Sequence, residues 1–112
     1  MIIDDPATFS VVWSQTTAYC RDGCPPPPPV DFNSQTVLAV FLGERGNGGY
    51  WIKIDRIDMT HNNVITVHVA VTTPGNNCVV PQIITEPYDI VDIPKTNSTI
   101  AFITETTVVN CV

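Results

Sequence analysis

From residue 36 onward, the chain consists of short runs in which β-branched and apolar side chains recur at every second position. "VITVHVAVT", residues 64–72, and "YWIKIDRI", residues 50–57, both alternate in this way. Successive side chains of a strand point to opposite faces, so each run can bury one face and leave the other in solvent. "TVLAVFL", residues 36–42, is continuously apolar, as in a strand buried on both faces. This period of two predicts a mainly β fold.

Two further runs, residues 83–93 and 99–106, predict the remaining strands. Pro87 lies within the first of them and is expected to break or bulge it, because proline cannot donate a hydrogen bond to a sheet ladder. The links between runs are short, and neither a repeat nor a second domain is visible. We therefore expect one domain over residues 1–112, an antiparallel β-sandwich or a rolled sheet.

The single helical signal precedes the strands, in "DDPATFSVVWSQTTA". Asp5 can act as the N-cap, and Pro6 suits the first helical position, where no N–H is needed. One face is apolar at i, i+3 and i+4 spacing, formed by Phe9, Val12 and Trp13. The sequence predicts a short amphipathic helix over about residues 5–18 that caps the β domain.

The charge balance argues against several classes of partner. The chain has eleven acidic residues and five scattered basic ones, which gives a net charge of −6. Binding to nucleic acid or to an anionic membrane is therefore not expected. The apolar runs are far shorter than the roughly 20 residues that a membrane helix needs. The start, "MIIDDPATF", carries no basic and apolar leader pattern, so we expect a signal or lipoprotein segment to have been removed from it.

Four cysteines in a small, loop-rich chain predict disulfides, and with them an extracellular or cell-envelope location. Cys20 and Cys24 flank the turn-like "RDG" and are followed by five prolines, which make residues 20–31 a rigid arm. Cys78 follows the loop "TPGNN", and Cys111 lies next to the C-terminus. We expect the pairs Cys20–Cys24 and Cys78–Cys111.

Two chemical roles for the cysteines compete with the structural one. A redox pair would normally be spaced Cys-x-x-Cys beside a βαβ unit, and a zinc site would need Cys20 and Cys24 to be joined by His61 and His68. Neither spacing matches a known signature, so we expect neither a metal nor a cofactor.

The glycine cluster "GERGNGGYW", residues 43–51, lies between an apolar run and an alternating run. A Walker loop would need a lysine, and a dinucleotide fingerprint would need a following helix; both are missing. Asn47-Gly48 predicts a tight hairpin turn. A turn leaves the neighbouring charged and aromatic residues unexplained, so the cluster is a candidate partner-binding surface, formed by Glu44, Arg45, Gly46, Asn47, Gly48, Gly49, Tyr50 and Trp51.

The sequence offers no constellation for catalysis. A nucleophile needs a base within hydrogen-bond reach, and the two histidines are His61, in a predicted turn, and His68, among strand valines. The serines lack a nucleophile-elbow context, and the carboxylates are spread along the chain. We expect a protein that is not an enzyme.

A series of short motifs, in a fixed order, resembles one protein family: Asp31-Phe32, "VLAVFLG" through Gly43, Gly48-Gly49-Tyr50, Gln82, Pro87-Tyr88 and Pro94-Lys95. The arrangement resembles the C-terminal domain of PrcB, a subunit associated with a bacterial subtilisin-like surface protease complex. The resemblance extends roughly from Asp5 to Phe102 and includes the aromatic residues of the helix. Asn47, where threonine or serine would be expected, and the five prolines depart from the family pattern.

The resemblance implies an accessory role, in which the domain binds, stabilises or helps to mature an extracellular protease. A second likeness is to chagasin-type protease inhibitors, whose inhibitory loop ends in Gly-Tyr; in that mode Gly46–Trp51 would enter the protease cleft. A structural or ligand-binding β domain of a larger envelope protein is the third possibility. For Tyr50 itself, we expect instead a place on the core face of its strand, because Ile52 and Ile54 share that face.

Overall fold

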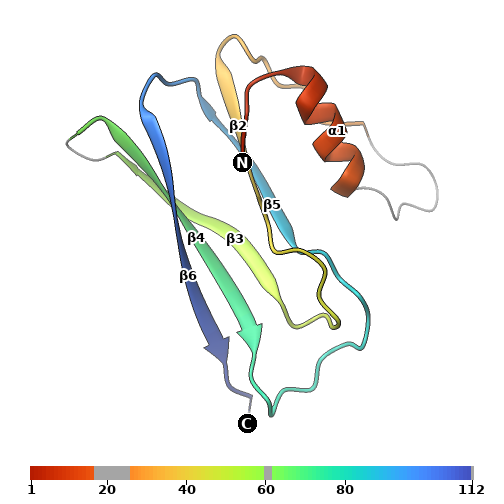
Figure 1. Cartoon of the computed structure of the whole chain (residues 1–112). Helices are drawn as coiled ribbons and strands as arrows, with labels where there is room; N and C mark the ends of the chain where they lie inside the picture. Colours follow the sequence, from red (N-terminus) through yellow and green to blue (C-terminus); the bar gives the residue numbers. More distant parts are fainter. Residues whose placement is uncertain (17–25, 60–61, 112) are drawn as a thin grey trace. The chain divides into compact units, whose positions relative to one another are not determined.

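The computed structural model describes residues 1–16, 26–59 and 62–111. It confirms the mainly β prediction with one short N-terminal helix: two three-stranded sheets have the strand orders β1-β2-β5 and β3-β4-β6. The expected Cys20–Cys24 bond and His61 lie outside the described residues. The elements, labelled in Figure 1, are β1 (Ile2–Ile3), α1 (Pro6–Thr16), β2 (Gln35–Phe41), β3 (Trp51–Met59), β4 (Val64–Pro74), β5 (Tyr88–Pro94) and β6 (Thr99–Val109).

The chain divides into two compact units. The first unit contains Met1–Ala39 and Ile90–Thr96, and the second contains Val40–Asp89 and Asn97–Val112. Of the three boundaries, one falls within β2, one within β5 and one in the link between β5 and β6.

In the first unit, helix α1 begins at the predicted cap. The Thr8 N–H donates to Asp5 Oδ1 at 2.7 Å, and the Thr8 hydroxyl donates to Asp5 Oδ2 at 2.8 Å. These two hydrogen bonds, the backbone one first, hold the pKa of the Asp5 carboxyl below its usual value. Pro6 occupies the first helical position, which needs no hydrogen-bonded N–H.

The core of the first unit forms where α1 packs on β1 and β2. Phe9 lies edge-on to Trp13, with ring centroids 6.1 Å apart, and to Phe32, with ring centroids 5.9 Å apart. β2 is buried from residue 36 to residue 40, as its continuously apolar sequence predicts. The buried cluster contains Ile3, Phe9, Val12, Val37 and Ala39, with Trp13, Val30, Phe32 and Ile90 packed against it.

In the second unit, β4 is the central strand of its sheet. β3 pairs with it antiparallel, with a bulge between Ile54 and Arg56. The predicted alternation of β4 is confirmed, because one face of the strand is buried: Ile65, Val67, Val69 and Val71. β5 begins at Tyr88, directly after Pro87, where the sequence predicts a break.

The pairing of β6 differs from the antiparallel expectation. β6 runs parallel to β4, from Val64 opposite Thr99 to Pro74 opposite Val109. A hairpin link would force antiparallel strands, whereas a long crossover allows parallel ones. Here residues 75–98 leave the sheet, contribute β5 to the other sheet and return to the beginning of β4.

The predicted Cys78–Cys111 disulfide is present, with its Cα atoms 4.8 Å apart. Two hydrogen bonds hold the same end of the unit: Gly75 N–H donates to the Val109 carbonyl at 2.8 Å, and Cys111 N–H donates to Asn77 Oδ1 at 3.1 Å. Together they attach the C-terminal tail to the end of β4. Among the described residues, no helix has the length and apolar character needed to cross a membrane.

Candidate partner-binding site

The glycine cluster connects β2 to β3, and these strands belong to different sheets. The predicted Asn47-Gly48 hairpin is therefore wrong. A primed turn also needs positive φ at its central residues, but in the described chain positive φ occurs only at Gly43, with φ 82°, and at Asn63. Gly43 follows β2 within two residues and turns the chain out of the strand direction.

The cluster is instead held against a distant segment, residues 81–85. Arg45 and Thr85 exchange two backbone hydrogen bonds, of 2.8 and 2.9 Å. Gly48 N–H donates to the Pro81 carbonyl at 2.8 Å, and the Thr85 hydroxyl donates to the Asn47 carbonyl at 2.9 Å. These bonds fix the backbone of the cluster before any partner binds.

Two of the glycines allow this close approach. A Cβ atom at Gly48 would lie 3.2 Å from Pro81, and one at Gly49 would lie 2.7 Å from Val80 Cγ1 and 2.8 Å from Pro74 Cγ. Gly49 N–H also donates to Asn47 Oδ1 at 2.9 Å, a side-chain turn typical of asparagine. Packing against residues 74–81, and not a hairpin conformation, accounts for Gly48 and Gly49.

Gly49→Ala is expected to lower the free energy of unfolding by about 1–3 kcal/mol, because the added methyl group overpacks a closed site. The matched control is Gly46→Ala: no atom lies within 4 Å of the Cβ position at Gly46, so its effect should stay within about 0.5 kcal/mol. Urea unfolding of both variants measures the difference. Equal midpoints for the two variants would contradict this packing.

Arg45 and Tyr50 form a pair within the cluster. The Arg45 guanidinium lies over the Tyr50 ring, 5.4 Å from its centroid, which is a cation–π geometry. Arg45 Nε is buried and has no hydrogen-bond partner among the described residues. Tyr50 is half-buried and precedes the first residue of β3. The pair stiffens the loop at the point where it enters the strand.

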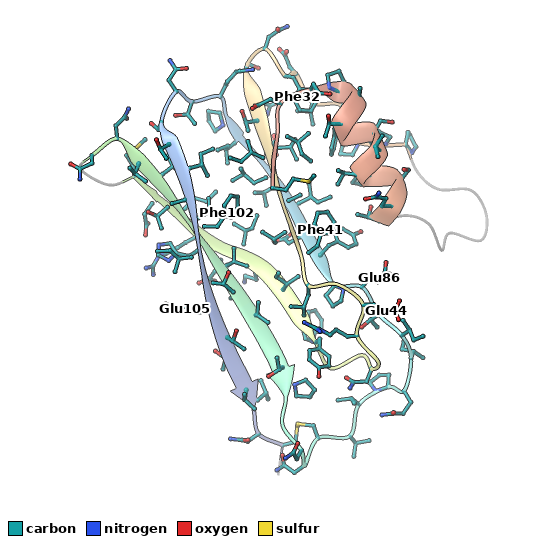
Figure 2. The ribbon with its side chains drawn as sticks, in the orientation of Figure 1. Phe32, Phe41, Glu44, Glu86, Phe102 and Glu105 are labelled. Atoms are coloured by element: carbon teal, nitrogen blue, oxygen red, sulfur yellow. A yellow bond between two sulfur atoms is a disulfide. The ribbon has the colours of Figure 1, made fainter. Side chains whose placement is uncertain are left out.

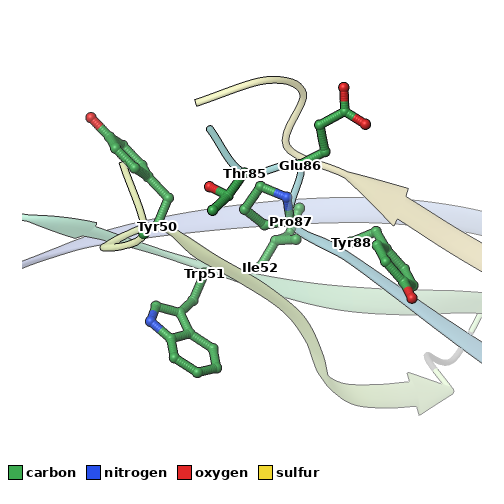
Figure 3. Close-up of a pocket in the computed structure, with 8 residues that line it drawn as sticks. Tyr50, Trp51, Ile52, Thr85, Glu86, Pro87 and Tyr88 are labelled. Carbon is green, nitrogen blue, oxygen red and sulfur yellow. The ribbon is translucent and has the colours of Figure 1, made fainter. Parts of the chain in front are cut away.

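Beside this pair lies a groove of about 360 Å³ within the second unit. Figure 3 shows its side chains, with Tyr50 and Trp51 pointing in different directions from the beginning of β3. One wall comes from the glycine cluster and β3, and the other comes from the chain that leads into β5. The lining residues are Gly48, Tyr50, Trp51, Ile52, Thr85, Glu86, Pro87 and Tyr88.

Trp51 is the most exposed aromatic residue of the groove, with 68% of its surface accessible, and Tyr88 is 41% exposed. The Tyr88 ring lies near that of Phe41, with centroids 6.5 Å apart. Trp51 also lines a second hollow of about 160 Å³, which extends to Val79 and the Cys78–Cys111 disulfide. A large aromatic side chain that borders two hollows and remains open to solvent is available to a partner.

The groove contains part of the predicted surface. Gly48, Tyr50 and Trp51 line it, whereas the other predicted residues do not: Glu44, Arg45, Gly46, Asn47 and Gly49. Glu44 and Gly46 are exposed, and Asn47 and Gly49 support the loop. Sequence reasoning did not assign Ile52 or the wall at residues 85–88 to the site. The one signal for that wall was the Pro87-Tyr88 motif.

On β3 and β4, His68 Nε2 lies 2.9 Å from Asp58 Oδ2, and Arg56 Nε lies 3.1 Å from the same oxygen. His68 is half-buried in the sheet, among the valines of β4. Among the described residues, no group of three His, Cys, Asp or Glu side chains is placed to hold a metal ion.

Comparisons with known proteins give one match. No curated protein and no solved structure matches the chain. A family model described as PrcB C-terminal matches residues 36–94, more than half of the 112 residues. The matched range runs from β2 through the glycine cluster, β3, β4 and the groove to the end of β5. The chain therefore belongs to the PrcB C-terminal family.

Proposed function

We propose that this chain is a non-catalytic binding domain of a secreted or envelope protein, and that it holds an extracellular, subtilisin-like protease through the groove of Trp51 and Tyr88. Membership of the PrcB C-terminal family supports a role beside a protease complex. The Cys78–Cys111 disulfide supports an oxidising compartment outside the cytoplasm.

The exposed side chain of Trp51 carries the proposal. Tryptophan, tyrosine and arginine dominate the binding energy of protein interfaces because they bury a large area with few rotatable bonds. Trp51 is 68% exposed at the groove, so a partner that covered it would remove much apolar surface from water.

The contacts that support the groove favour binding without rearrangement. The Thr85 hydrogen bonds to Arg45 and Asn47 join the two sides of the site, and the Arg45–Tyr50 contact supports the same loop. A rigid surface loses less conformational entropy when a partner binds. The exposed carboxylates Glu44 and Glu86 give this region an acidic edge, which suits a partner with a basic rim.

The test is a titration of the non-reduced domain against a purified subtilisin and against papain, followed by both calorimetry and residual protease activity. We expect subtilisin to bind and to retain its activity. Trp51→Ala should weaken binding by about 30-fold or more, the effect of losing a hot spot of about 2 kcal/mol.

The matched control is Met59→Ala. Met59 is 62% exposed on the same strand as Trp51 but does not line the groove, so its replacement should change affinity less than about threefold. If the domain inhibits the protease stoichiometrically and Trp51→Ala no longer does so, the domain is an inhibitor and not an accessory domain. Equal losses of affinity for the two variants would mean that the protease contact lies outside the groove. No binding to either protease would overturn a direct protease contact.

A further inference from the structure

The outer strand of the β3-β4-β6 sheet has an open edge. Among the described strands, β6 pairs with β4 alone. Its sequence, "TIAFITETTVV", contains no proline, glycine or lysine and only one charge, at Glu105. The free N–H and C=O groups of an edge strand can pair with another chain. Natural proteins usually prevent this with proline or charged residues, with a short strand or with a covering element. At 11 residues, β6 is also long for an edge strand.

The exposure of β6 extends to both of its faces. Every residue from 102 to 109 is exposed, although consecutive side chains of a strand point to opposite sides. The exposed side chains include large apolar ones: Ile103 is 47% exposed, Val108 is 57% and Val109 is 45%. Figure 2 shows Phe102 and Glu105 on this strand. Most of β6 thus presents an open backbone edge together with apolar side chains.

We propose that β6 pairs antiparallel with β6 of a second copy of this chain, about a two-fold axis at Thr104. Thr104 is the middle residue of Thr99–Val109, so this register overlaps the two strands completely. The contact is the same patch on both copies, as closed two-fold dimers require. It would join the two sheets into one, with the strand order β3-β4-β6-β6-β4-β3.

The sequence of β6 is complementary to itself in this register. Ile100 lies opposite Val108 of the partner copy, and Thr104 lies opposite Thr104; β-branched pairs of this kind stabilise antiparallel strands. Glu105 lies opposite Ile103 and so does not face its own copy. Shifting the axis by one residue, to residue 105, would place the two carboxylates directly opposite, which is destabilising.

The net charge of −6 per chain opposes association, and salt screens such repulsion between exposed charges. We therefore expect analytical ultracentrifugation of the full chain to show a concentration-dependent dimer that tightens between low and physiological salt. Glu105→Gln should tighten it further, because the two carboxylates are diagonal neighbours about 7–8 Å apart across the pair. A monomer at every concentration and salt level would overturn the proposal.

Cysteine cross-linking tests the register. In the proposed pair, the two copies of residue 104 have Cα atoms about 4.5–5.5 Å apart, within reach of a disulfide. The two copies of residue 106 are displaced by four residues along the strands, or about 13 Å. Under mild oxidation, Thr104→Cys should give a covalent dimer and Thr106→Cys should not. Equal cross-linking by both variants would exclude this register.

Thr104→Lys places two like charges at the axis and should abolish the dimer. Ile83→Lys adds the same charge at an exposed site outside β6, where Ile83 is 59% exposed, and should leave the dimer intact. A dimer that persists in a folded Thr104→Lys variant would refute pairing through β6. These results do not depend on protease binding, because Trp51→Ala should dimerise like the unchanged chain.

Discussion

Replacing Cys78 and Cys111 together by serine is expected to lower the free energy of unfolding by about 4 kcal/mol, because the bridge restricts the unfolded chain. The two residues lie 33 positions apart, and loop-closure entropy grows slowly with the length of the closed loop. For a small domain whose total stability is about 5–15 kcal/mol, this is a large fraction. The melting temperature should fall by on the order of 15 °C.

Thermal and urea unfolding of the double variant measure this effect, and Trp51 fluorescence reports it from the same unit. The matched control is Cys20→Ser with Cys24→Ser. If these two cysteines pair as the sequence predicts, their loop of about five residues contributes only about 2 kcal/mol. The Cys78/Cys111 variant should therefore lose about twice as much stability. An unchanged midpoint would mean that the Gly75–Val109 and Cys111–Asn77 hydrogen bonds alone hold the tail.

The parts of the fold that were predictable from sequence depend on local chemistry. The Asp5 cap needs only a carboxylate three residues before a free N–H, and its hydrogen bonds to Thr8 are formed within one turn of helix. The alternation of β4 fixes which face is buried, because side chains in a strand have a period of two. The Cys78–Cys111 pair followed from the position of each cysteine beside a loop or a terminus.

The parts that were not predictable depend on partners far away in the chain. The parallel pairing of β4 and β6 results from a long crossover, which no local pattern specifies. Asn47-Gly48 has the sequence of a hairpin turn, but Pro81 and Thr85 supply the hydrogen bonds that determine its conformation. Gly48 and Gly49 are needed because a Cβ atom at these positions would lie only 3.2 Å from Pro81 and 2.7 Å from Val80, respectively.

The candidate site also has one part that local sequence predicts and one part that depends on distant residues. Trp51 was predicted as part of a partner-binding surface, and it is exposed at the beginning of β3. The opposite wall, residues 85–88, is more than 30 positions further along the sequence. It reaches the groove through the Arg45–Thr85 pairing, which joins two segments that belong to no regular strand pair. Sequence periodicity carries no information about such a bridge.

Phe9→Ala is the counterpart of the disulfide prediction in the first unit. Phe9 is 4% exposed, and its ring contacts Trp13 and Phe32 edge-on. Removing a buried phenylalanine ring costs about 3–5 kcal/mol, since apolar burial is lost and a cavity remains. Phe9 and Val12 are the two buried side chains of α1, and Trp13 is partly buried against the same cluster. We expect α1 to lose its fixed packing before the rest of the chain unfolds.

Val11→Ala is the matched control, because Val11 belongs to the same helix but is 59% exposed; its effect should stay within about 0.5 kcal/mol. The readout is Trp13 fluorescence in a Trp51→Phe background, which leaves one tryptophan and places it in the first unit. Phe9→Ala should lower the urea midpoint of this signal well below that of Val11→Ala. Similar midpoints would mean that the aromatic contacts of Phe9 do not hold the helix, and that β1 and β2 stabilise the first unit without it.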